Sequence, residues 1–446
     1  MVRLRVAAVT GWGSLVVAGF AWSCLLAQAP VPEWVPFAVC SLGLVWLRPQ
    51  LPLLSLLCTV PLTAAAGFGG MAAFAVVLTT VALVGFHAVL KGFRPGLDVW
   101  LIALLAVVLT VSCALPQTTW ESDQARDDLL CLLAGLALPV ACLVATPDAR
   151  RVAQLTAGCG AGVAAYLLLR GENAAGRLIG LGLNPNYAGV LLALATVAAV
   201  GMAKAAKNRA WLLPSLVCAA AVFETRSRGA YLTVLAGLTS LLLTGRPPRQ
   251  KALIALAALF AALILPGALN SQNELTGARS STELAANSDV RTQAALLAAR
   301  VAWDNPLRGV GYANFPHIAE STAGFRIYMN THNDYLRLAA EAGALALVLF
   351  AILIWRGLSR RCSGYDVVLR AVVVANGVAL VFANTLSNLV VTVPFWISLG
   401  CLLARAAVRE EAPPASDQRP SRPPADTRNH PHGMPRRTVQ PAPCPS

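Results

Sequence analysis

Three short segments of the chain combine arginine or histidine with turn-forming residues, and each leads into an apolar stretch. Residues 176–189 read Gly-Arg-Leu-Ile-Gly-Leu-Gly-Leu-Asn-Pro-Asn-Tyr-Ala-Gly, residues 225–232 read Thr-Arg-Ser-Arg-Gly-Ala-Tyr-Leu, and residues 332–343 read His-Asn-Asp-Tyr-Leu-Arg-Leu-Ala-Ala-Glu-Ala-Gly. The arginine guanidinium is a permanently charged fork that matches phosphate oxygens. Histidine can transfer protons near neutral pH. These residue types indicate a site that binds a phosphate or diphosphate and has a proton acceptor at hand.

The first segment has the composition of a tight turn that leads into a helix. Three glycines and an Asn-Pro-Asn sequence interrupt the apolar pattern there. We expect Asn186 to cap the helix and the flexible backbone to let a ligand come close to Arg177. A plain junction between loop and helix is the alternative interpretation.

In the second segment, two arginines and a serine stand at the start of a predicted helix. A helix N-terminus presents N–H groups and the positive end of the helix dipole, which favour an anion. An Arg-x-Arg spacing does not place both guanidinium groups on one helical face. We therefore expect Arg228 to contact the ligand and Arg226 to pair with Glu224.

His332 in the third segment is the candidate for a general base or acid. Outside the C-terminal tail the chain has two other histidines. His87 lies in the middle of an apolar run and is predicted to be packed in the core, whereas His317 is predicted to lie at the surface. The alternative for His332 is a capping or surface role.

Polar side chains follow His332 into the next predicted helix. Asn333 and Asp334 are its direct neighbours, and Arg337 and Glu341 are spaced i, i+4. Residues with this spacing lie on one face of a helix, so the arginine and the glutamate can form an ion pair at the membrane edge. We regard these four residues as supporting the site.

The elements that must position these segments are apolar. The chain has 446 residues, of which 57% are hydrophobic and only 13% charged, and its mean hydropathy is +0.63. Soluble domains carry about 25% charged residues, so the composition excludes a chain built of soluble domains. Apolar runs of about 20 residues span a bilayer as helices. The sequence predicts an all-α, polytopic integral membrane protein with about 12–14 transmembrane helices. The predicted spans are residues 6–28, 34–47, 51–67, 70–90, 97–115, 128–146, 152–169, 187–203, 210–223, 230–244, 251–268, 336–355, 366–386 and 390–405.

The net charge of +14 comes almost entirely from arginine, and the positive-inside rule assigns the loops to their sides. With both termini in the cytoplasm, 19 of the 35 basic residues lie in cytoplasmic loops and five in the tail. The other eleven, all arginine, lie on the periplasmic side, where the rule predicts few. Pairing with acidic residues of the same loops is the alternative to binding an anionic ligand. These arginines are Arg126, Arg170, Arg177, Arg226, Arg228, Arg279, Arg291, Arg300, Arg308, Arg326 and Arg337.

Two parts are predicted from these patterns. Residues 1–410 form the transmembrane domain, whose one long periplasmic loop covers about residues 269–335. Residues 411–446 contain ten prolines and are predicted to be a disordered cytoplasmic tail. Most of the eleven cysteines lie in apolar runs and none forms a CxxC pair, so we interpret them as small apolar residues.

The order and spacing of these segments resemble the O-antigen ligase family over about residues 170–350. This family belongs to a superfamily that also contains O-antigen and exopolysaccharide polymerases and pilin oligosaccharyltransferases. The matching elements are an Arg-then-Asn-x-Asn element (Arg177, Asn184, Asn186), Ser-Arg-Gly (Ser227 to Gly229), an Arg…Trp…Pro-x-x-Gly-x-Gly-x-x-x-Phe loop (Arg291 to Phe315) and His-Asn…Glu-x-Gly (His332 to Gly343).

The resemblance implies a glycosyltransferase of the bacterial inner membrane with a periplasmic active site. Its donor would be a glycan on undecaprenyl diphosphate, and its acceptor a sugar hydroxyl of lipid A–core, in lipopolysaccharide biosynthesis. Arg177, Arg228 and Arg291 would stabilise the leaving diphosphate, and His332 would accept the proton. No cofactor and no nucleic-acid partner are implied. The periplasmic loops lack an Asp-x-Asp motif, so we expect arginine to replace a divalent cation and a single displacement to invert the anomeric carbon.

Two other functions stay open. A polymerase of the same superfamily would extend the glycan on its lipid carrier, and these motifs do not separate it from a ligase. A transporter of an anionic glycolipid would place ionisable residues near the bilayer midplane. Here the charges gather at the outer edge of the spans, which favours an enzyme. We expect the late-span residues Asn376 and Asn384 to face other helices.

Overall fold

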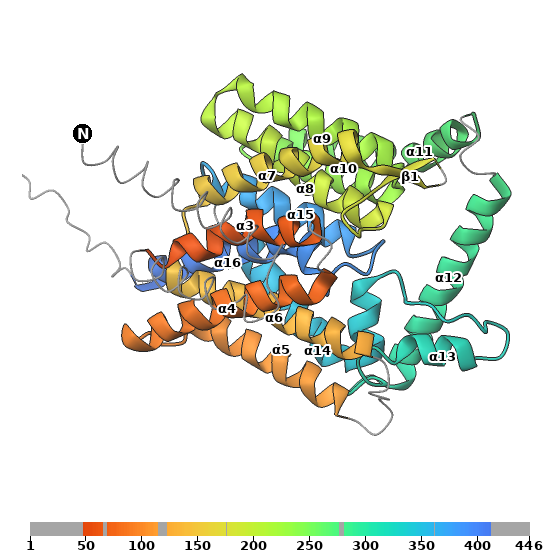
Figure 1. Ribbon diagram of the computed structural model, residues 1–446, viewed down its shortest axis with the longest axis horizontal. Helices are drawn as coiled ribbons and strands as arrows, with labels where there is room; N and C mark the ends of the chain where they lie inside the picture. The colour runs from red at the N-terminus through yellow and green to blue at the C-terminus, as the bar shows by residue number, and fades with distance from the viewer. Residues whose placement is uncertain are drawn as a thin grey trace, which may run out of the picture. The chain divides into compact units, whose positions relative to one another are not determined.

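The computed structural model describes residues 48–65, 69–114, 123–174, 176–275, 281–360 and 362–411. The two predicted spans before residue 48 and the proline-rich tail lie outside the described residues. Helices dominate the described part, with one two-stranded hairpin (Figure 1). The elements are α3 (Gln50–Ala65), α4 (Gly69–Leu90), α5 (Leu97–Cys113), α6 (Asp123–Ala145), α7 (Ala149–Arg170), β1 (Glu172–Ala174), β2 (Arg177–Ile179), α8 (Pro185–Ala206), the 3-10 helix η1 (Arg209–Trp211), α9 (Leu212–Thr225), α10 (Arg228–Leu243), α11 (Pro248–Leu275), α12 (Ser281–Asp304), α13 (Phe315–Ser321), α14 (Asp334–Leu358), α15 (Asp366–Ala379) and α16 (Leu389–Glu411).

The prediction of an all-α polytopic membrane protein is confirmed. Each predicted span from residue 51 onward overlaps a helix. Among the described residues, α4, α6, α7, α8 and α14 contain segments long and apolar enough to cross a bilayer, and α3, α5, α10 and α16 contain shorter apolar segments. The total of 12–14 spans stays a prediction.

Helix α8 lies at the centre of the bundle. It packs against α7, α9, α10 and α15, and most of its residues are buried on all sides. A helix that is apolar all round is buried in the core of a membrane bundle. Its N-terminus carries the Asn-Pro-Asn sequence, so a helix buried inside the bundle supports one of the three polar segments.

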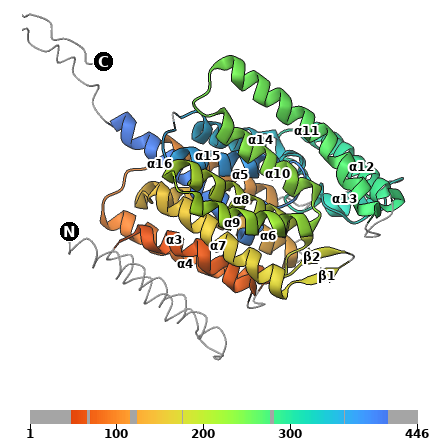
Figure 2. The ribbon, with the colours of Figure 1, turned by 90° about the horizontal axis from the view of Figure 1, so that it is seen from above.

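The predicted periplasmic loop at 269–335 contains regular structure. It holds the end of α11 together with α12 and α13, because its alanine-rich stretch at 294–302 favours a helix although it is not apolar enough for a span. Figure 1 shows α12 crossing the end of the bundle at which β1 and α13 also lie. Figure 2 shows α11 at the outer edge of the bundle, next to α10.

The predicted span at 366–386 is too long. Its helix, α15, ends at Ala379, and residues 380–388 are not helical. The N–H groups of Thr385 and Leu386 donate instead to Oδ2 of Asp334, at 2.7 and 2.9 Å. The buried carboxylate of Asp334 thereby accepts hydrogen bonds from two backbone N–H groups that have no partner within a helix.

Candidate active site

Helices α8, α10 and α14 begin at the same cavity, which has a volume of about 720 Å³. Their N-caps Asn184, Ser227 and Asn333 all line it. Each cap side chain accepts hydrogen bonds from the first turn of its own helix. Three helix N-termini contribute positive potential at one place, which suits an anion. The expectation that Asn186 caps α8 is wrong, because Asn184 Oδ1 accepts from N–H groups of the first turn at 3.0 Å.

Four arginines and His332 line this cavity. Arg177 comes from β2, Arg226 and Arg228 from the junction of α9 and α10, and Arg291 from α12. The structure therefore brings together side chains that are up to 155 residues apart in the sequence.

The other arginines that the sequence assigns to the periplasmic side do not line the cavity. Arg337 is buried in the bundle, and Arg279 lies outside the described residues. The exposed arginines are Arg126, Arg170, Arg300, Arg308 and Arg326. The arginine excess of this side of the molecule thus separates into a cavity group and a surface group, which the loop assignments did not distinguish.

Arg177 is oriented by uncharged acceptors. Its Nε donates to the Thr225 carbonyl at 3.0 Å, and its Nη2 donates to Asn186 Oδ1 at 2.9 Å. The Ser227 hydroxyl donates to the same amide oxygen at 3.2 Å. These two acceptors hold the guanidinium in place. Asn186, predicted as a cap, instead joins the hairpin arginine to the start of α10.

Arg226 and Arg228 lie in the same cavity although they are two residues apart. The prediction that they point apart assumed a single helix. Arg226 ends α9 with a left-handed backbone (φ 48°), and Arg228 begins α10. The turn between the helices removes the helical restriction on the pair. Nη2 of Arg228 also donates to Ser288 on α12, at 3.2 Å, which links α10 to α12.

His332 occupies a tight turn directly before α14. Its φ of 53° is a conformation that few residues other than glycine adopt, and such backbone strain is common at functional sites. The Thr331 hydroxyl donates to the Asn333 carbonyl at 2.8 Å and so closes the turn. Burial, and secondly the Arg291 guanidinium, lower the pKa of His332 from 6.5 to about 4. The imidazole is therefore neutral at pH 7 and able to accept a proton. The alternative interpretation, in which His332 caps the helix, is wrong, because Asn333 is the N-cap of α14.

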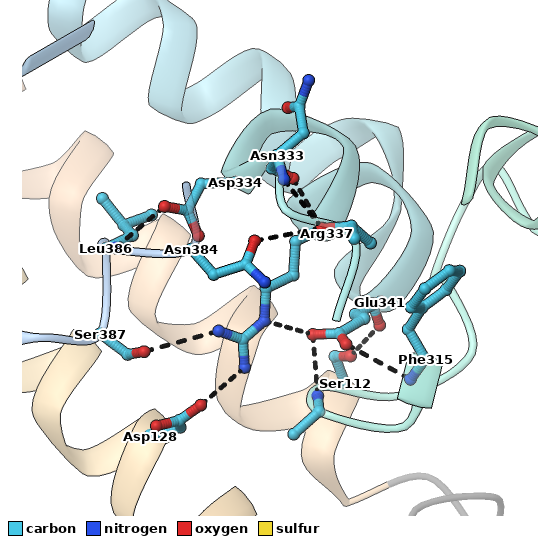
Figure 3. Close-up of polar contacts among 12 residues, drawn as sticks. Ser112, Asp128, Phe315, Asn333, Asp334, Arg337, Glu341, Asn384, Leu386 and Ser387 are labelled. Atoms are coloured by element: carbon cyan, nitrogen blue, oxygen red, sulfur yellow. Dashed lines mark hydrogen bonds and ion pairs between the residues drawn. The ribbon is translucent and has the colours of Figure 1, made fainter. Parts of the chain in front are cut away.

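Arg337 lies in a buried ionic network beneath the cavity (Figure 3). The expected pair forms, with Arg337 Nε 3.0 Å from Glu341 Oε2, and Nη2 lies 3.0 Å from Asp128 Oδ2 on α6. The guanidinium also stacks on the Tyr312 ring, 4.7 Å from its centroid. Arg337 is only 3% exposed, so it supports the first turns of α14 and does not line the cavity.

The carboxylate of Glu341, which pairs with Arg337, also holds the loop that precedes α13. Fully buried, it accepts from the N–H groups of Ala313 at 2.9 Å and Phe315 at 3.3 Å. Its backbone carbonyl accepts from the Ser112 hydroxyl of α5, at 2.6 Å. One residue therefore joins α5, α14 and the loop, as Figure 3 shows.

Helix α14 is kinked at Gly343 (φ 86°, ψ 169°), and the glycine-containing loop fits against the kink. Val310 N–H donates to the Ala340 carbonyl at 2.9 Å, and Ala344 N–H to the Pro306 carbonyl at 2.7 Å. A Cβ at Gly309, where φ is +65°, would lie 2.4 Å from the Glu341 carbonyl carbon. Close backbone approach explains why glycine occupies this position.

Replacing Gly309 with alanine is expected to destabilise the protein more than the same change at Gly324. Both glycines have positive φ, which costs an alanine about 1–2 kcal/mol, but a Cβ at Gly324 meets no atom within 4 Å. Both variants carry the cost of positive φ, so the difference between their thermal unfolding temperatures measures the clash at Gly309. Equal unfolding temperatures would show that the loop does not pack tightly on α14.

The other histidines differ in part from expectation. His317 is exposed, as predicted, and its ring contacts Tyr328. His87 is half-buried on α4, next to exposed Phe86, so it is not a core residue. Asn376 is buried on α15, whereas Asn384, predicted to lie in the same span, is buried in the non-helical segment 380–388, where its Oδ1 accepts from the Thr331 hydroxyl at 3.3 Å.

Sequence reasoning missed the capping roles of Asn184 and Asn333, and it missed Asp128 and Ser288 as partners of site residues. The caps could have been found, since Asn followed by a helical pattern is a start signal. No local signal identifies Asp128 or Ser288, because their partners are distant in sequence. Among the described residues, no group of three His, Cys, Asp or Glu side chains is arranged to hold a metal ion.

The comparisons with known proteins agree with this site. Residues 213–351 match the family model described as O-antigen ligase. The match runs from α9 into α14 and includes Arg228, Arg291 and His332. No curated protein matches the chain. Over residues 213–351 the chain is thus similar to the O-antigen ligase family, whose superfamily comprises membrane glycosyltransferase-like ligases and polymerases.

Proposed function

We propose that the chain is an O-antigen ligase, which transfers a glycan from undecaprenyl diphosphate to a sugar hydroxyl of lipid A–core. The observation that supports this is the single cavity in which four arginines, three helix N-termini and His332 meet. The positive groups suit a diphosphate, and the neutral imidazole suits a general base. The family supports a lipid-linked glycan as substrate and a membrane setting.

The proposed chemistry is a single displacement. The acceptor oxygen attacks the anomeric carbon, the bond from that carbon to the diphosphate oxygen breaks, and its electron pair leaves with the diphosphate. The acceptor proton passes to His332. Arg177, Arg228 and Arg291 stabilise the charge that develops on the leaving group, without a divalent cation. The attack inverts the anomeric centre.

A bound diphosphate would also strengthen the base. In the empty cavity, burial and Arg291 hold the pKa of His332 near 4. A diphosphate placed among the arginines adds negative charge beside the imidazole, which favours its protonated form. The pKa of His332 then rises toward the operating pH, where general bases are most effective. Donor binding would thus prepare the residue that activates the acceptor.

The function is tested by profiling lipopolysaccharide from a strain that lacks the protein. Loss of the whole O-antigen ladder, with accumulation of the lipid-linked glycan, supports the ligase. Core that carries a single repeat unit identifies the protein as a polymerase. Accumulation of the glycan on the cytoplasmic side points to a transporter, and an unchanged profile removes all three functions.

We place the protein in the bacterial inner membrane, with both termini in the cytoplasm and the cavity open to the periplasm. The positive-inside distribution of basic residues supports this orientation. The donor glycan must meet its acceptor on the side where the cavity opens. Labelling Glu320→Cys on α13, which is exposed, with a membrane-impermeant maleimide in spheroplasts tests the orientation.

Replacing Arg228 or Arg177 with alanine is expected to lower the transfer rate by about 10²–10³-fold, the usual loss when one group that stabilises transition-state charge is removed. The matched control is Arg300→Ala on α12, because Arg300 is exposed and does not line the cavity. Transfer is measured in membranes from cells that lack the native protein. Wild-type rates in both cavity variants would contradict the diphosphate role.

A further inference from the structure

A second cavity, of about 1220 Å³, follows the length of α10. It lies between α10, α11 and α15, and its walls are mainly leucine, alanine and valine side chains. Leu232 and Phe382 line both this groove and the arginine cavity, so the two adjoin each other. Figure 2 shows α11 beside α10 at the outer edge of the bundle, where lipid chains would surround it.

The end of the groove farthest from the arginine cavity is basic. Lys251 and Arg370 line it there, next to Thr244. Arg370 is half-buried and its Nη2 donates to Thr244 Oγ1 at 2.9 Å. The structure records no carboxylate of the described residues within 4 Å of either cation, and the sequence has no acidic residue between Glu224 and Glu274. This end therefore carries positive charge without an acidic counterpart on α10 or the adjoining half of α11.

The length of the groove matches one leaflet of a bilayer. The twelve steps from Leu232 to Thr244, the C-cap of α10, rise by about 18 Å, and the hydrocarbon of one leaflet is roughly 15 Å deep. A ligand that fills the whole groove needs an anionic head that binds Arg370 and Lys251, and an apolar chain about as long as one leaflet is deep.

We infer that the groove binds an anionic phospholipid of the cytoplasmic leaflet, such as phosphatidylglycerol. Its phosphate would lie between Arg370, Lys251 and Thr244, and an acyl chain would run along α10 toward Leu232. Basic pockets between transmembrane helices on the cytoplasmic side are suited to anionic headgroups. The lipid-linked donor of the proposed function does not fill this role, because its charged end lies at the opposite end of the groove.

Such a lipid would have a structural consequence for the arginine cavity. It would fill the space between α11 and α15, and α11 contacts the next helix in the sequence, α12, which carries Arg291. The bound lipid would therefore fix the helix that positions one wall of the cavity.

The test is a lipid titration of the full-length protein in detergent, followed by native mass spectrometry. Phosphatidylglycerol is expected to bind more tightly than zwitterionic phosphatidylethanolamine. Arg370→Gln and Lys251→Gln should each weaken phosphatidylglycerol binding roughly fivefold, from about 1 kcal/mol per basic residue. Arg249→Gln is the matched control, since Arg249 is exposed on α11 and does not line the groove. Ala258→Trp should weaken binding without changing the charge, because it fills the groove.

Four results would overturn the inference. Equal binding of the two lipids would remove the role of the headgroup, and an equal loss in Arg249→Gln would show only general surface attraction. Full competition by glycerol 1-phosphate, or unchanged binding in Ala258→Trp, would remove the acyl chain from the site. Displacement of phosphatidylglycerol by undecaprenyl phosphate with equal strength in wild type and Arg370→Gln would assign the groove to the donor chain. The binding assay involves no glycan transfer, so its failure is distinct from failure of the proposed function.

Discussion

Replacement of His332 by alanine is expected to lower glycan transfer by roughly 10²–10⁴-fold, the contribution of a positioned general base. The residue lies in the arginine cavity, and its neutral imidazole can take the proton of an acceptor hydroxyl. The rate is measured in membranes with lipid-linked glycan and core acceptor. His317→Ala is the control, because His317 is exposed on α13 and does not line the cavity. Wild-type transfer by the His332 variant would exclude it as the base.

The pH dependence tests the same assignment. A pKa near 4 keeps His332 neutral through the physiological range, so the acid limb of kcat/KM, which reports the free enzyme, should fall near pH 4. Arg291→Gln removes a positive charge that lowers this pKa. The limb should then move to higher pH, toward 6.5, whatever the variant loses in absolute rate. An acid limb at the same pH in both proteins would mean that another group controls it.

The lowered pKa also has a consequence for stability. The unfolded chain binds a proton at His332 with a pKa near 6.5, whereas the folded protein does so only near 4. This group therefore contributes its full stability above pH 6.5, and the contribution falls as the pH drops from 6.5 to about 4. His332→Ala lacks this term, so its loss of stability over that range should be smaller.

Replacement of Arg337 by alanine is expected to cost about 3–5 kcal/mol of stability, because it leaves a buried charge without its partner. Glu341 is fully buried and its carboxylate is paired with Arg337 at 3.0 Å. The variant also loses the contact with Asp128 and the stacking on Tyr312. The midpoint of heat-induced aggregation, followed by size-exclusion chromatography in detergent, should fall sharply. Arg300→Ala, a change at an exposed arginine, should leave it unchanged.

A double variant separates charge from packing. In Arg337→Met with Glu341→Gln, position 341 no longer carries a buried charge that lacks its partner, and the glutamine oxygen can still accept from Ala313 or Phe315. This variant should be more stable than Arg337→Ala alone, although both lack the ion pair. If it is less stable, the pair itself contributes more than the cost of burying its charges.

Local patterns predicted much of the fold and of the site. Apolar runs of fixed length placed the helices from residue 51 onward except α12 and α13, since the bilayer dictates how long an apolar run must be. Residue type singled out His332, Arg177, Arg228 and Arg291, all of which line the cavity. The predictions that failed concern which of two nearby residues in the sequence has a given role or orientation. Asn184 rather than Asn186 caps α8, and a turn places Arg226 beside Arg228.

What the sequence determined by itself is the membrane character of the chain and the segments that carry its polar chemistry, because both follow from residue types over short distances. Only the tertiary structure decided which of the arginines predicted to be periplasmic share a cavity with His332, since β2, α10 and α12 meet there through packing between distant segments. It also paired Asp128 with Arg337 across 209 positions. Such contacts depend on how helices pack around α8 and α14, and no local pattern of hydrophobicity or charge encodes that arrangement.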